Sequence, residues 1–442
     1  MRQTLSRWSA VVAAALLAGC SGTLVPDETT GGAPTSSTKV RTGAPIVDSK
    51  AEVPPATAAE RSLFAQASNA FSADLYRELS VTPGNLFYSP ASLSTALAMT
   101  WIGARGATRD QMTSVLHFGD VKGADANALT SSAARLIVAM NDPARTDYTL
   151  SIVNRLFGEQ TYGFDAGFLD VTKKQFGAEL AAVDFKHAFE PVRGQINDYV
   201  ATSTHDKIKN LIPSGAIDED VRLVLVNAIY MHADWATPFD KAATTKQPFH
   251  LTPTSSVDVD TMHGEVYAPM GEVDGVQMID LPYRGGDLSM TILLPKDASR
   301  MGELEAKITG GGLDAMVAGL QATKVDLALP KFKIDPQAPL GLAGTLSKLG
   351  MPLAFSEGAA DFSGMRKPGE EALFISKVFH KAFVAVDELG TEAAAASAIV
   401  MSRETADVPS NTVFVADHPF LFVLRDKKSG LVLFMGRLAD PS

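Results

Sequence analysis

Residues 387–404 read DELGTEAAAASAIVMSRE, and small side chains dominate this stretch. From residue 391 to residue 398 the side chains form two alternating sets. One set is Thr391, Ala393, Ala395 and Ser397, and the other is Glu392, Ala394, Ala396 and Ala398. In a β-strand the two sets would face opposite sides of a sheet, and only Glu392 would require water. Gly390 precedes the run and gives the backbone a hinge without the limits that a Cβ atom imposes. The pattern predicts a segment that can slide between two existing strands without pushing them apart.

An alanine-rich run is, on its own, more typical of a helix than of a strand. The flanking sequences reverse this interpretation. Residues 374–388 (FISKVFHKAFVAVDE) and 413–426 (VFVADHPFLFVLRD) are both rich in the β-branched and aromatic side chains that favour strands. Residues 405–411 are polar and contain Pro409, which indicates an exposed loop between the run and the second flank.

Two motifs here resemble the serpin family. The sequence E-x-G-T-E-A-A-A-A, which begins at Glu388, is similar to the serpin hinge, and residues 414–424 (FVADHPFLFVL) are similar to the family signature that follows the reactive loop. The resemblance runs in matching order from about residue 63 to residue 438. It implies a suicide inhibitor of serine proteases with a reactive loop at about residues 388–411. A protease cleaves the loop, and the freed hinge inserts into the main sheet while the protease is still attached as an acyl-enzyme.

The resemblance also assigns positions within the loop. The implied hinge residues are Glu388, Gly390, Thr391, Glu392, Ala393, Ala394, Ala395, Ala396 and Ser397. Fourteen residues beyond Gly390 stands Glu404, so counting places the reactive bond between Glu404 and Thr405. The alternative register, Arg403–Glu404, would suit a trypsin-like pocket through a charge-assisted pair. The alternative function is a non-inhibitory serpin-fold protein that uses an inert loop for binding or surface interaction.

Five further residues match positions that support opening of the serpin sheet. Ser89 and Ser92, in a segment whose Pro90 suits the first turn of a helix, are expected beneath the main sheet where its strands part. Asn227 lies in a strand-like run at residues 221–230, and the resemblance implies a hydrogen bond between it and His380. Trp235 is expected at the top of the sheet. Without the resemblance, Trp235 would be interpreted as a core residue.

The chain begins with features of an exported lipoprotein. Residues 1–19 combine Arg2 and Arg7 with a short apolar stretch and predict a signal peptide. The sequence Leu-Ala-Gly-Cys at residues 17–20 resembles a bacterial lipobox, which implies lipidation of Cys20, the single cysteine of the chain. An ordinary signal peptide with a chance cysteine is the alternative. Residues 20–59, rich in Thr, Ser, Pro, Gly and Ala, predict a disordered tether. We expect an envelope location, in the outer membrane or on the cell surface.

The remaining residues, 60–442, are expected to form one serpin domain of the α+β class. Apolar residues at helical spacing predict a helix over residues 62–79, and residues 196–211 are expected to form the helix that crosses the sheet. Strands are expected at residues 276–283 and 288–295, joined by a turn at 284–287, and at residues 325–334. The resemblance implies a large mixed sheet with two smaller sheets and about nine helices.

Composition excludes several other classes of function. The formal net charge is −11, and removal of Arg2 and Arg7 with the signal peptide makes it −13, so nucleic acid is not expected as a partner. The sequence contains no nucleophile elbow, zinc-binding helix, phosphate loop or dinucleotide motif, and its eight histidines lack ligand spacing. We therefore expect no enzymatic activity, no metal and no cofactor. The expected partner is a target serine protease, bound covalently by a monomer.

Overall fold

The computed structural model describes residues 51–141, 145–391 and 412–442. The α-helices within them are α1 Ala58–Leu79, α2 Pro90–Trp101, α3 Gly106–Val115, α4 Ala126–Met140, α5 Ala166–Phe176, α6 Phe185–Ser203, α7 Met301–Thr309, α8 Leu313–Ala318 and α9 Ala343–Leu349. The strands are β1 Leu86–Tyr88, β2 Tyr148–Glu159, β3 Leu180–Val183, β4 Leu223–Asp234, β5 Thr245–Thr252, β6 Ser255–Val273, β7 Val276–Pro282, β8 Leu288–Pro295, β9 Gln321–Pro330, β10 Phe332–Ile334, β11 Leu340–Gly341, β12 Phe379–His380, β13 Val384–Val386, β14 Gly390–Thr391, β15 Val413–Val415, β16 Phe420–Asp426 and β17 Val432–Leu438.

These strands form three sheets, which confirms the α+β class. A nine-stranded sheet has the order β1-β17-β16-β8-β7-β6-β9-β15, with β5 beside β6. A six-stranded sheet has the order β10-β13-β14-β4-β2-β3, and β11 pairs with β12 in a small third sheet. Most pairs are antiparallel, but β15 pairs with β9, and β2 with β3, in parallel.

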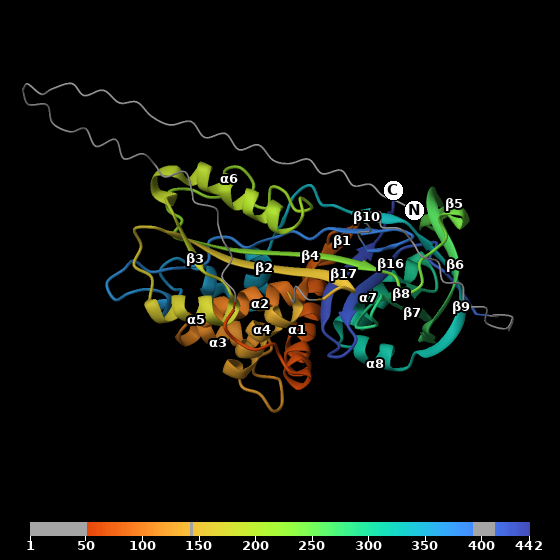
Figure 1. Cartoon of the computed structure of the whole chain (residues 1–442), viewed down its shortest axis with the longest axis horizontal. Coiled ribbons are helices and arrows are strands. Elements are labelled where there is room, and N and C mark those ends of the chain that lie inside the picture. Colours follow the sequence, from red (N-terminus) through yellow and green to blue (C-terminus); the bar gives the residue numbers. More distant parts are fainter. Residues whose placement is uncertain (1–50, 142–144, 392–411) are drawn as a thin grey trace, which may run out of the picture. The chain divides into compact units, whose positions relative to one another are not determined.

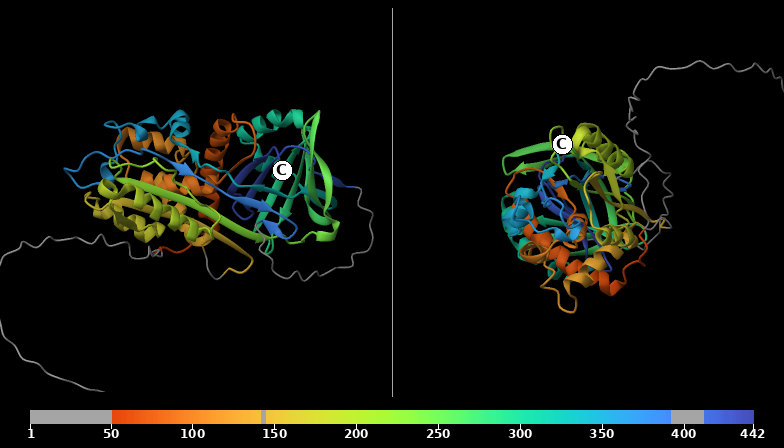
Figure 2. Two further views of the ribbon diagram at one scale, coloured as in Figure 1. Left: turned by 90° about the horizontal axis from the view of Figure 1, so that it is seen from above. Right: turned by 90° about the vertical axis from the view of Figure 1, so that its left-hand side faces the viewer.

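The six-stranded sheet lies between two layers of helix (Figure 1). On one face, Ile229 and Met231 of β4 join the main hydrophobic cluster, to which α2 also contributes. On the other face, Val226 and Ala228 of β4 pack in a separate cluster with side chains of α6. Two further views show the early helices gathered at one end and the strands β5 to β9 at the other (Figure 2). The six-stranded sheet therefore has a distinct environment on each face.

Local sequence explains where the first two helices begin. The hydroxyl of Thr57 accepts a hydrogen bond from Glu60 N, and the Glu60 carboxylate accepts one from Thr57 N, which is a capping box at the start of α1. The side chain of Ser89 accepts from Ser92 N, and Pro90 occupies the first turn of α2. Every residue of α2 is buried, so this helix forms the floor on which the six-stranded sheet rests.

Several element predictions are confirmed, and two are confirmed only in part. The helix at residues 62–79 and the strands β7 and β8 are present, and Gly285 and Gly286 adopt positive φ in the turn between those strands. The strand expected at 325–334 divides into β9 and β10 at Lys331, whose N–H bonds to Asp260 O instead. The crossing helix α6 ends at Ser203, well before residue 211.

The early end of α6 has a backbone cause. His205 and Asp206, directly after the helix, have φ angles of 51° and 64°, in the left-handed region that a right-handed helix cannot continue through. Ala188 has non-helical angles near the start of the same helix, close to Pro191. The spacing of hydrophobic residues predicts neither the end of α6 at Ser203 nor the irregular backbone at Ala188.

The signal peptide, the lipidation site and most of the expected tether lie outside the described residues, so the predicted domain boundaries stay predictions. Across residues 51–141, 145–391 and 412–442, none of the helices combines the length and the apolarity of a membrane span.

Candidate functional site

The first two residues of the small-residue stretch form a strand inside the six-stranded sheet. This strand, β14, lies between β13 and β4 and is antiparallel to both. Thr391 pairs with Val386 on one side and with Ala233 on the other, and Gly390 pairs with Asp234. The side chain of Thr391 is 2% exposed. The sheet has therefore already separated at this end, and it holds the start of the predicted hinge.

Residue 390 must be glycine because the backbone of β4 leaves no room for a side chain there. A Cβ atom at this position would lie 2.1 Å from the carbonyl oxygen of Ala233 and 2.8 Å from Asp234 Cα, distances that no real side chain shows. The sequence predicts conformational freedom as the reason for this glycine, and the structure gives a different one. The φ angle of Gly390 is outside the left-handed region, so its role is to let two backbones approach closely.

An aromatic pair fixes the position of Thr391. The Thr391 hydroxyl hydrogen-bonds to the Tyr283 hydroxyl, and the Tyr283 ring stacks on Trp235 with the ring centroids 4.7 Å apart. Trp235 Nε1 donates to Asp387 O at 3.0 Å. Burial raises the pKa of Tyr283, so its hydroxyl keeps its proton. Trp235 lies at the end of β4 beside the hinge, as the resemblance implies, and is also buried in the core.

A buried carboxylate holds the chain just before the hinge. Lys331 Nζ lies 2.9 and 3.0 Å from the two carboxylate oxygens of Glu388, and the Thr244 hydroxyl donates to the same carboxylate at 2.9 Å. Burial alone would raise the pKa of Glu388, but the hydrogen bonds from Lys331 and Thr244 hold it below its usual value. The carboxylate is therefore charged, and its ion pair fastens the end of β13 to the connection between β9 and β10.

Below β14 the sheet is open. Leu223 and Leu225 of β4 face residues 373–379 across a small cavity of about 60 Å³, whose floor includes Leu93 and Leu97 of α2. Residues 371–378 form no strand, although they continue the line of β12 and β13. The lining is mainly apolar, and Asn227 contributes a polar group to it. This gap begins where β14 ends and extends toward the first residue of β4.

A polar network connects the middle of the gap to α2. Ser92 Oγ donates to Asn227 Oδ1 at 2.8 Å, and Asn227 Nδ2 donates to Ser92 O at 3.0 Å and to Asn154 Oδ1 at 2.8 Å. Ser89 Oγ donates to Leu433 O at 2.6 Å. Ser89, Ser92 and Asn227 are all buried, so these bonds form in an environment where losing one partner is costly. The structure brings these residues together, and their part in sheet opening stays a prediction.

The expected hydrogen bond between His380 and Asn227 is wrong. The backbone N–H of Ser89 donates to His380 Nε2 at 2.9 Å, and the amide of Asn227 is occupied by Ser92 and Asn154. His380 is therefore linked to Asn227 only indirectly, through the start of α2. Because Nε2 must accept, Nδ1 carries the proton, and within the described part of the chain it has no hydrogen-bond partner. Burial lowers the pKa of His380 to about 3, which keeps the ring neutral.

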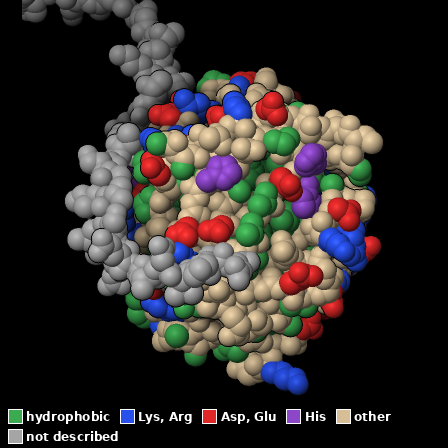
Figure 3. Space-filling model, turned by 90° about the vertical axis from the view of Figure 1, so that its right-hand side faces the viewer, with side chains coloured by type: hydrophobic (Ala, Val, Ile, Leu, Met, Phe, Trp, Pro, Cys, Tyr) green, Lys and Arg blue, Asp and Glu red, His purple; other side chains and the backbone are tan. Residues whose placement is uncertain are grey.

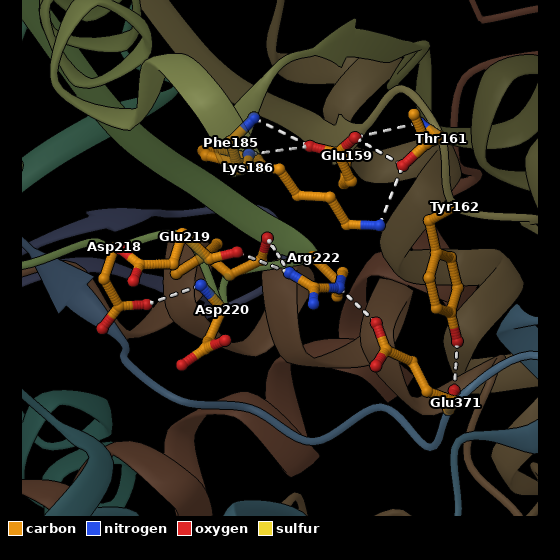
Figure 4. A network of polar contacts seen from close by, with 11 residues as sticks. Glu159, Thr161, Tyr162, Phe185, Lys186, Asp218, Glu219, Asp220, Arg222 and Glu371 are labelled. Atoms are coloured by element: carbon orange, nitrogen blue, oxygen red, sulfur yellow. Dashed lines mark hydrogen bonds and ion pairs between the residues drawn. The ribbon is translucent and has the colours of Figure 1, made fainter.

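An ion pair spans the far end of the gap (Figure 4). Arg222, directly before β4, pairs through Nε with Glu371 Oε1, and Glu371 lies on the segment that borders the gap. The Tyr162 hydroxyl donates to Glu371 O at 2.5 Å. Glu371 is half exposed, so this pair is weaker than the buried one at Glu388. This pair connects the two flanks at the far end, and the hydrogen bond from Trp235 Nε1 to Asp387 O connects them beside the hinge.

Glu159 anchors α6 near the same end. Its carboxylate accepts hydrogen bonds from the backbone N–H groups of Phe185 and Lys186, in the first turn of α6, and from Thr161 (Figure 4). Burial alone would raise the pKa of Glu159, but these bonds hold it below its usual value. A buried carboxylate at the end of β2 therefore fixes the start of the helix that covers the sheet.

Sequence reasoning missed the partners that hold the hinge. Tyr283, Lys331 and Arg222 carry no local signal, because their importance depends on contacts with residues 108, 57 and 149 positions away. The proposed reactive bond and the hinge positions after Thr391, namely Glu392, Ala393, Ala394, Ala395, Ala396, Ser397, Arg403, Glu404 and Thr405, lie outside the described residues. Nowhere in the described ranges do three or more metal-ligating side chains gather.

Comparisons with known proteins agree with this geometry. The family model of the serpins, serine protease inhibitors, matches residues 66–441. The leukocyte elastase inhibitor of Xenopus laevis is 39% identical over 84% of this chain and 97% of its own length, and that of Homo sapiens is 38% identical over 85% and 98%. The crystal structure of human thyroxine-binding globulin with thyroxine, 28% identical, superposes with a TM-score of 0.77 and covers 87% of this chain and all of its own.

The Lys331–Glu388 pair generates a prediction about stability. Lys331→Ala should lower the free energy of unfolding by about 1–3 kcal/mol, because it leaves a buried carboxylate without a cationic partner. The matched control is Lys333→Ala, which breaks a more exposed pair with Asp335 and should cost less than about 1 kcal/mol. Urea denaturation of the uncleaved protein measures both. Equal losses in the two variants would contradict the role of Lys331.

The same pair predicts a pH dependence. The pKa of Glu388 is lowered in the folded state, so the stability that it contributes is present above the unfolded value of about 4.3. That contribution is lost as the pH falls through the lower, folded value. Lys331→Ala should therefore be closest to the wild type in stability at acidic pH and differ most near neutrality. Urea denaturation at a series of pH values measures the difference.

Proposed function

This chain belongs to the serpin family, and we propose that it is a suicide inhibitor of serine proteases that inserts the freed part of its reactive loop between β13 and β4. Serpins are protease inhibitors, so the chain is an inhibitor and not an enzyme. The observation that carries the proposal is β14 itself. The hinge has already entered the sheet at Gly390 and Thr391, and an open gap continues beyond it.

The register of β14 indicates how far insertion would extend. Thr391 pairs with Ala233, and the two strands are antiparallel, so each later residue would pair one position nearer the start of β4. Leu223, the first residue of β4, lies ten positions before Ala233, and Met401 lies ten positions after Thr391. Cleavage between Glu404 and Thr405 would thus free enough chain to pair with the whole length of β4.

The same register assigns a face to each side chain. Directly paired residues point to the same side of a sheet, and Ala233, Met231 and Ile229 belong to the main core above α2. Ala393 would then meet Met231, and Ala395 would meet Ile229, on that crowded face. Ala393 and Ala395 are therefore small at the positions where the core above α2 leaves little room for a side chain. Ser397 would pair with Asn227, next to the polar network of Ser92.

Insertion would release free energy. About a dozen new residues would enter the ladder, and each backbone hydrogen bond contributes about 1 kcal/mol net, so the inserted form would be more stable by on the order of 10 kcal/mol. The apolar gap would also be filled. The intact protein is therefore metastable, and the loop holds it in that state because its two ends are fixed until a protease cuts it.

Trapping depends on a competition between two rates. The catalytic serine of the protease forms an ester with the carbonyl of the residue before the reactive bond, and the amine of the next residue leaves. Water would then hydrolyse the ester and complete ordinary proteolysis. If insertion is faster, the protease is carried along the sheet and its active site is distorted before hydrolysis. The alternative function, an inert binding loop, does not require the small inward residues at Thr391, Ala393, Ala395 and Ser397.

We also propose that lipidated Cys20 anchors the protein to a membrane of a bacterial cell envelope. The support is the lipobox-like sequence at residues 17–20, the preceding signal-like segment and the polar stretch that follows. The family match begins at residue 66, so it carries no information about these residues. The anchored form would place the inhibitor at a surface where it meets secreted proteases.

The inward face of the hinge can be tested with one charge. Thr391→Arg would place an unpaired cation on the α2 side of the sheet at a cost of several kcal/mol, so insertion should fail and the loop should be cut as a plain substrate. Glu392→Arg is the matched control, because its side chain would face the opposite side. SDS gels measure the yield of covalent complex with a serine protease. Equal yields from Thr391→Arg and the wild type would remove insertion from the mechanism.

The reactive bond can be located directly. We expect a covalent complex with a glutamyl-preferring protease and release of a carboxyl-terminal fragment that begins at Thr405. Mass spectrometry of the denatured complex measures the fragment. Glu404→Gln should prevent the complex, and Arg403→Gln should leave it intact. A fragment that begins at Glu404 would instead establish the Arg403–Glu404 register and a trypsin-like target.

Membrane attachment has its own test. Cys20→Ala should move the protein from the membrane fraction to the soluble fraction of bacterial cells, because the lipid would have no attachment atom. Ser21→Ala, one residue later, should leave the distribution unchanged. If Cys20→Ala remains with the membranes, the anchor is not on this cysteine.

A further inference from the structure

The first described residues of the chain form a strap that is bound to two helices. The strap, residues 51–57, lies before α1 and contains no helix or strand. Glu52 N donates to Lys174 O of α5 at 2.5 Å. The guanidinium of Arg135, on α4, donates to Pro54 O at 3.0 Å, and the Arg135 carbonyl accepts a further bond from the strap backbone. The strap is therefore fixed to the body of the molecule along its length.

The strap determines where the predicted tether leaves the body. The family model matches from residue 66 onward, so the strap lies outside the matched region. The sequence predicts a tether over residues 20–59, and the structure shows that it joins the body at residue 51, before α1 begins at Ala58. Because Lys174 holds the strap, the tether leaves the body beside α5.

α5 lies toward the end of the six-stranded sheet where β4 begins. β3, the strand that follows α5, starts at Leu180, which pairs with Leu156 of β2. Leu156 pairs in turn with Leu225, close to the first residue of β4. Figures 1 and 2 show α5 at one end of the molecule and the strands β5, β6 and β9 at the other. We call the surface formed by α5 and the start of β4 the α5 end.

The hinge occupies the opposite end of the same sheet. β14 pairs with Ala233 and Asp234, the last two residues of β4, and insertion would proceed from there toward Leu223. β4 has 12 residues, so its two ends are about 40 Å apart. A protease attached to the inserting loop would therefore leave the hinge end and arrive at the α5 end.

We propose that the α5 end faces the membrane in the lipid-anchored protein, so that loop insertion carries the trapped protease into the space between the body and the lipid surface. This inference rests on the proposed function and on the proposed anchor at Cys20. The uncleaved loop is then presented away from the membrane, where proteases approach from solution. After trapping, the protease lies beside the lipid.

The length of the tether has a role in this arrangement. Residues 21–50, between the lipidated cysteine and the strap, span at most about 100 Å. A protease of about 220 residues has a diameter of about 40 Å. The tether is therefore long enough to hold the body away from the lipid while a protease occupies the space between them.

The charge of the α5 end keeps that space open. Asp218, Glu219 and Asp220 are exposed just before β4, and Figure 4 shows them beside Arg222. Anionic lipid headgroups attract basic clusters and repel adjacent carboxylates such as these. At the opposite end, Figure 3 shows carboxylate and histidine side chains around a hydrophobic middle, with Lys and Arg side chains toward the margin. Among the described residues, neither end thus has a basic centre, and the tether sets the orientation.

The orientation can be measured by energy transfer. The lipidated protein is incorporated into phosphatidylcholine vesicles that carry an acceptor dye on a small fraction of headgroups. A donor dye is attached to one introduced cysteine, because the lipid occupies Cys20. The two positions are Ala166→Cys, at the start of α5, and Thr254→Cys, in the turn between β5 and β6, and both are exposed. Transfer from residue 166 should exceed transfer from residue 254 by at least about twofold, because the sheet separates its ends by about 40 Å.

Movement of the protease has its own readout. The donor dye is placed on a glutamyl-preferring protease, and the anchored inhibitor is left unlabelled. The active protease should transfer more energy to the lipid dye than the same protease with its catalytic serine replaced by alanine. The inactive form stays at the uncleaved loop, and only the active form is carried to the α5 end.

Deletion of residues 24–43 tests the length of the tether. The residues that remain between Cys20 and the strap span at most about 35 Å, less than the diameter of the protease. The yield of SDS-stable complex on vesicles should fall several-fold. The same deletion combined with Cys20→Ala should keep the full yield in solution. Replacement of residues 24–43 by a Gly/Ser segment of equal length is the matched control and should restore the yield on vesicles.

Three results would overturn the inference: equal transfer from residues 166 and 254, equal transfer from active and inactive protease, or equal trapping by the shortened tether on vesicles and in solution. A Gly/Ser segment that fails to restore the yield would overturn the role of length. Failure of the underlying proposals is distinguishable. If no SDS-stable complex forms even in solution, the inhibitory mechanism fails, while transfer from residues 166 and 254 still decides which end faces the lipid. If the wild type does not sediment with the vesicles, the anchor at Cys20 fails and the inference fails with it.

Discussion

The carbonyl oxygen of Ala233 occupies the space where a side chain on residue 390 would be, and the arrangement of the main sheet depends on that contact. Because residue 390 is glycine, the hinge can lie against β4 closely enough to form ladder hydrogen bonds. Thr391 then reaches Tyr283, and Tyr283 stacks on Trp235. One missing side chain therefore allows a sheet that already holds the start of the hinge at one end and has a small cavity beside β4 beyond it.

The gap in the sheet is held by contacts of unequal strength. Lys331 and Glu388 form a buried ion pair that fixes the chain before the hinge on the β13 side, and Arg222 and Glu371 form a more exposed pair that crosses the far end of the gap. Between them, hydrogen bonds from Asn227 connect β4 to α2. Removing a partner costs most where burial is greatest. The chain that leads into the hinge is therefore fixed more firmly than the far end of the gap.

Sequence reasoning identified the elements whose signal is local. Apolar spacing found α1, and turn chemistry found the hairpin of Gly285 and Gly286. The motif resemblance found the fold and the residues around the hinge. Sequence reasoning failed where contacts between distant residues determine the structure. His380 bonds to Ser89 rather than to Asn227, and the strand expected at residues 325–334 divides into β9 and β10 at Lys331. The partners of Glu388 and Glu371 are more than 50 residues away, and no pattern of neighbouring residues records them.

The separate hydrophobic cluster under α6 has a consequence for motion. Phe185, Ile196 and Val200 of α6 pack with Val226 and Ala228 of β4, and none of these side chains belongs to the main core. The helix can therefore lift from the sheet without opening that core, as an independent cooperative unit of the native state. Glu159 holds the first turn of α6, and two hydrogen bonds between Asn197 and the backbone of Ile212 hold its second half to the segment that follows the helix. Opening of this cluster would expose the amides of α6 to exchange with solvent while those of the main core stay protected.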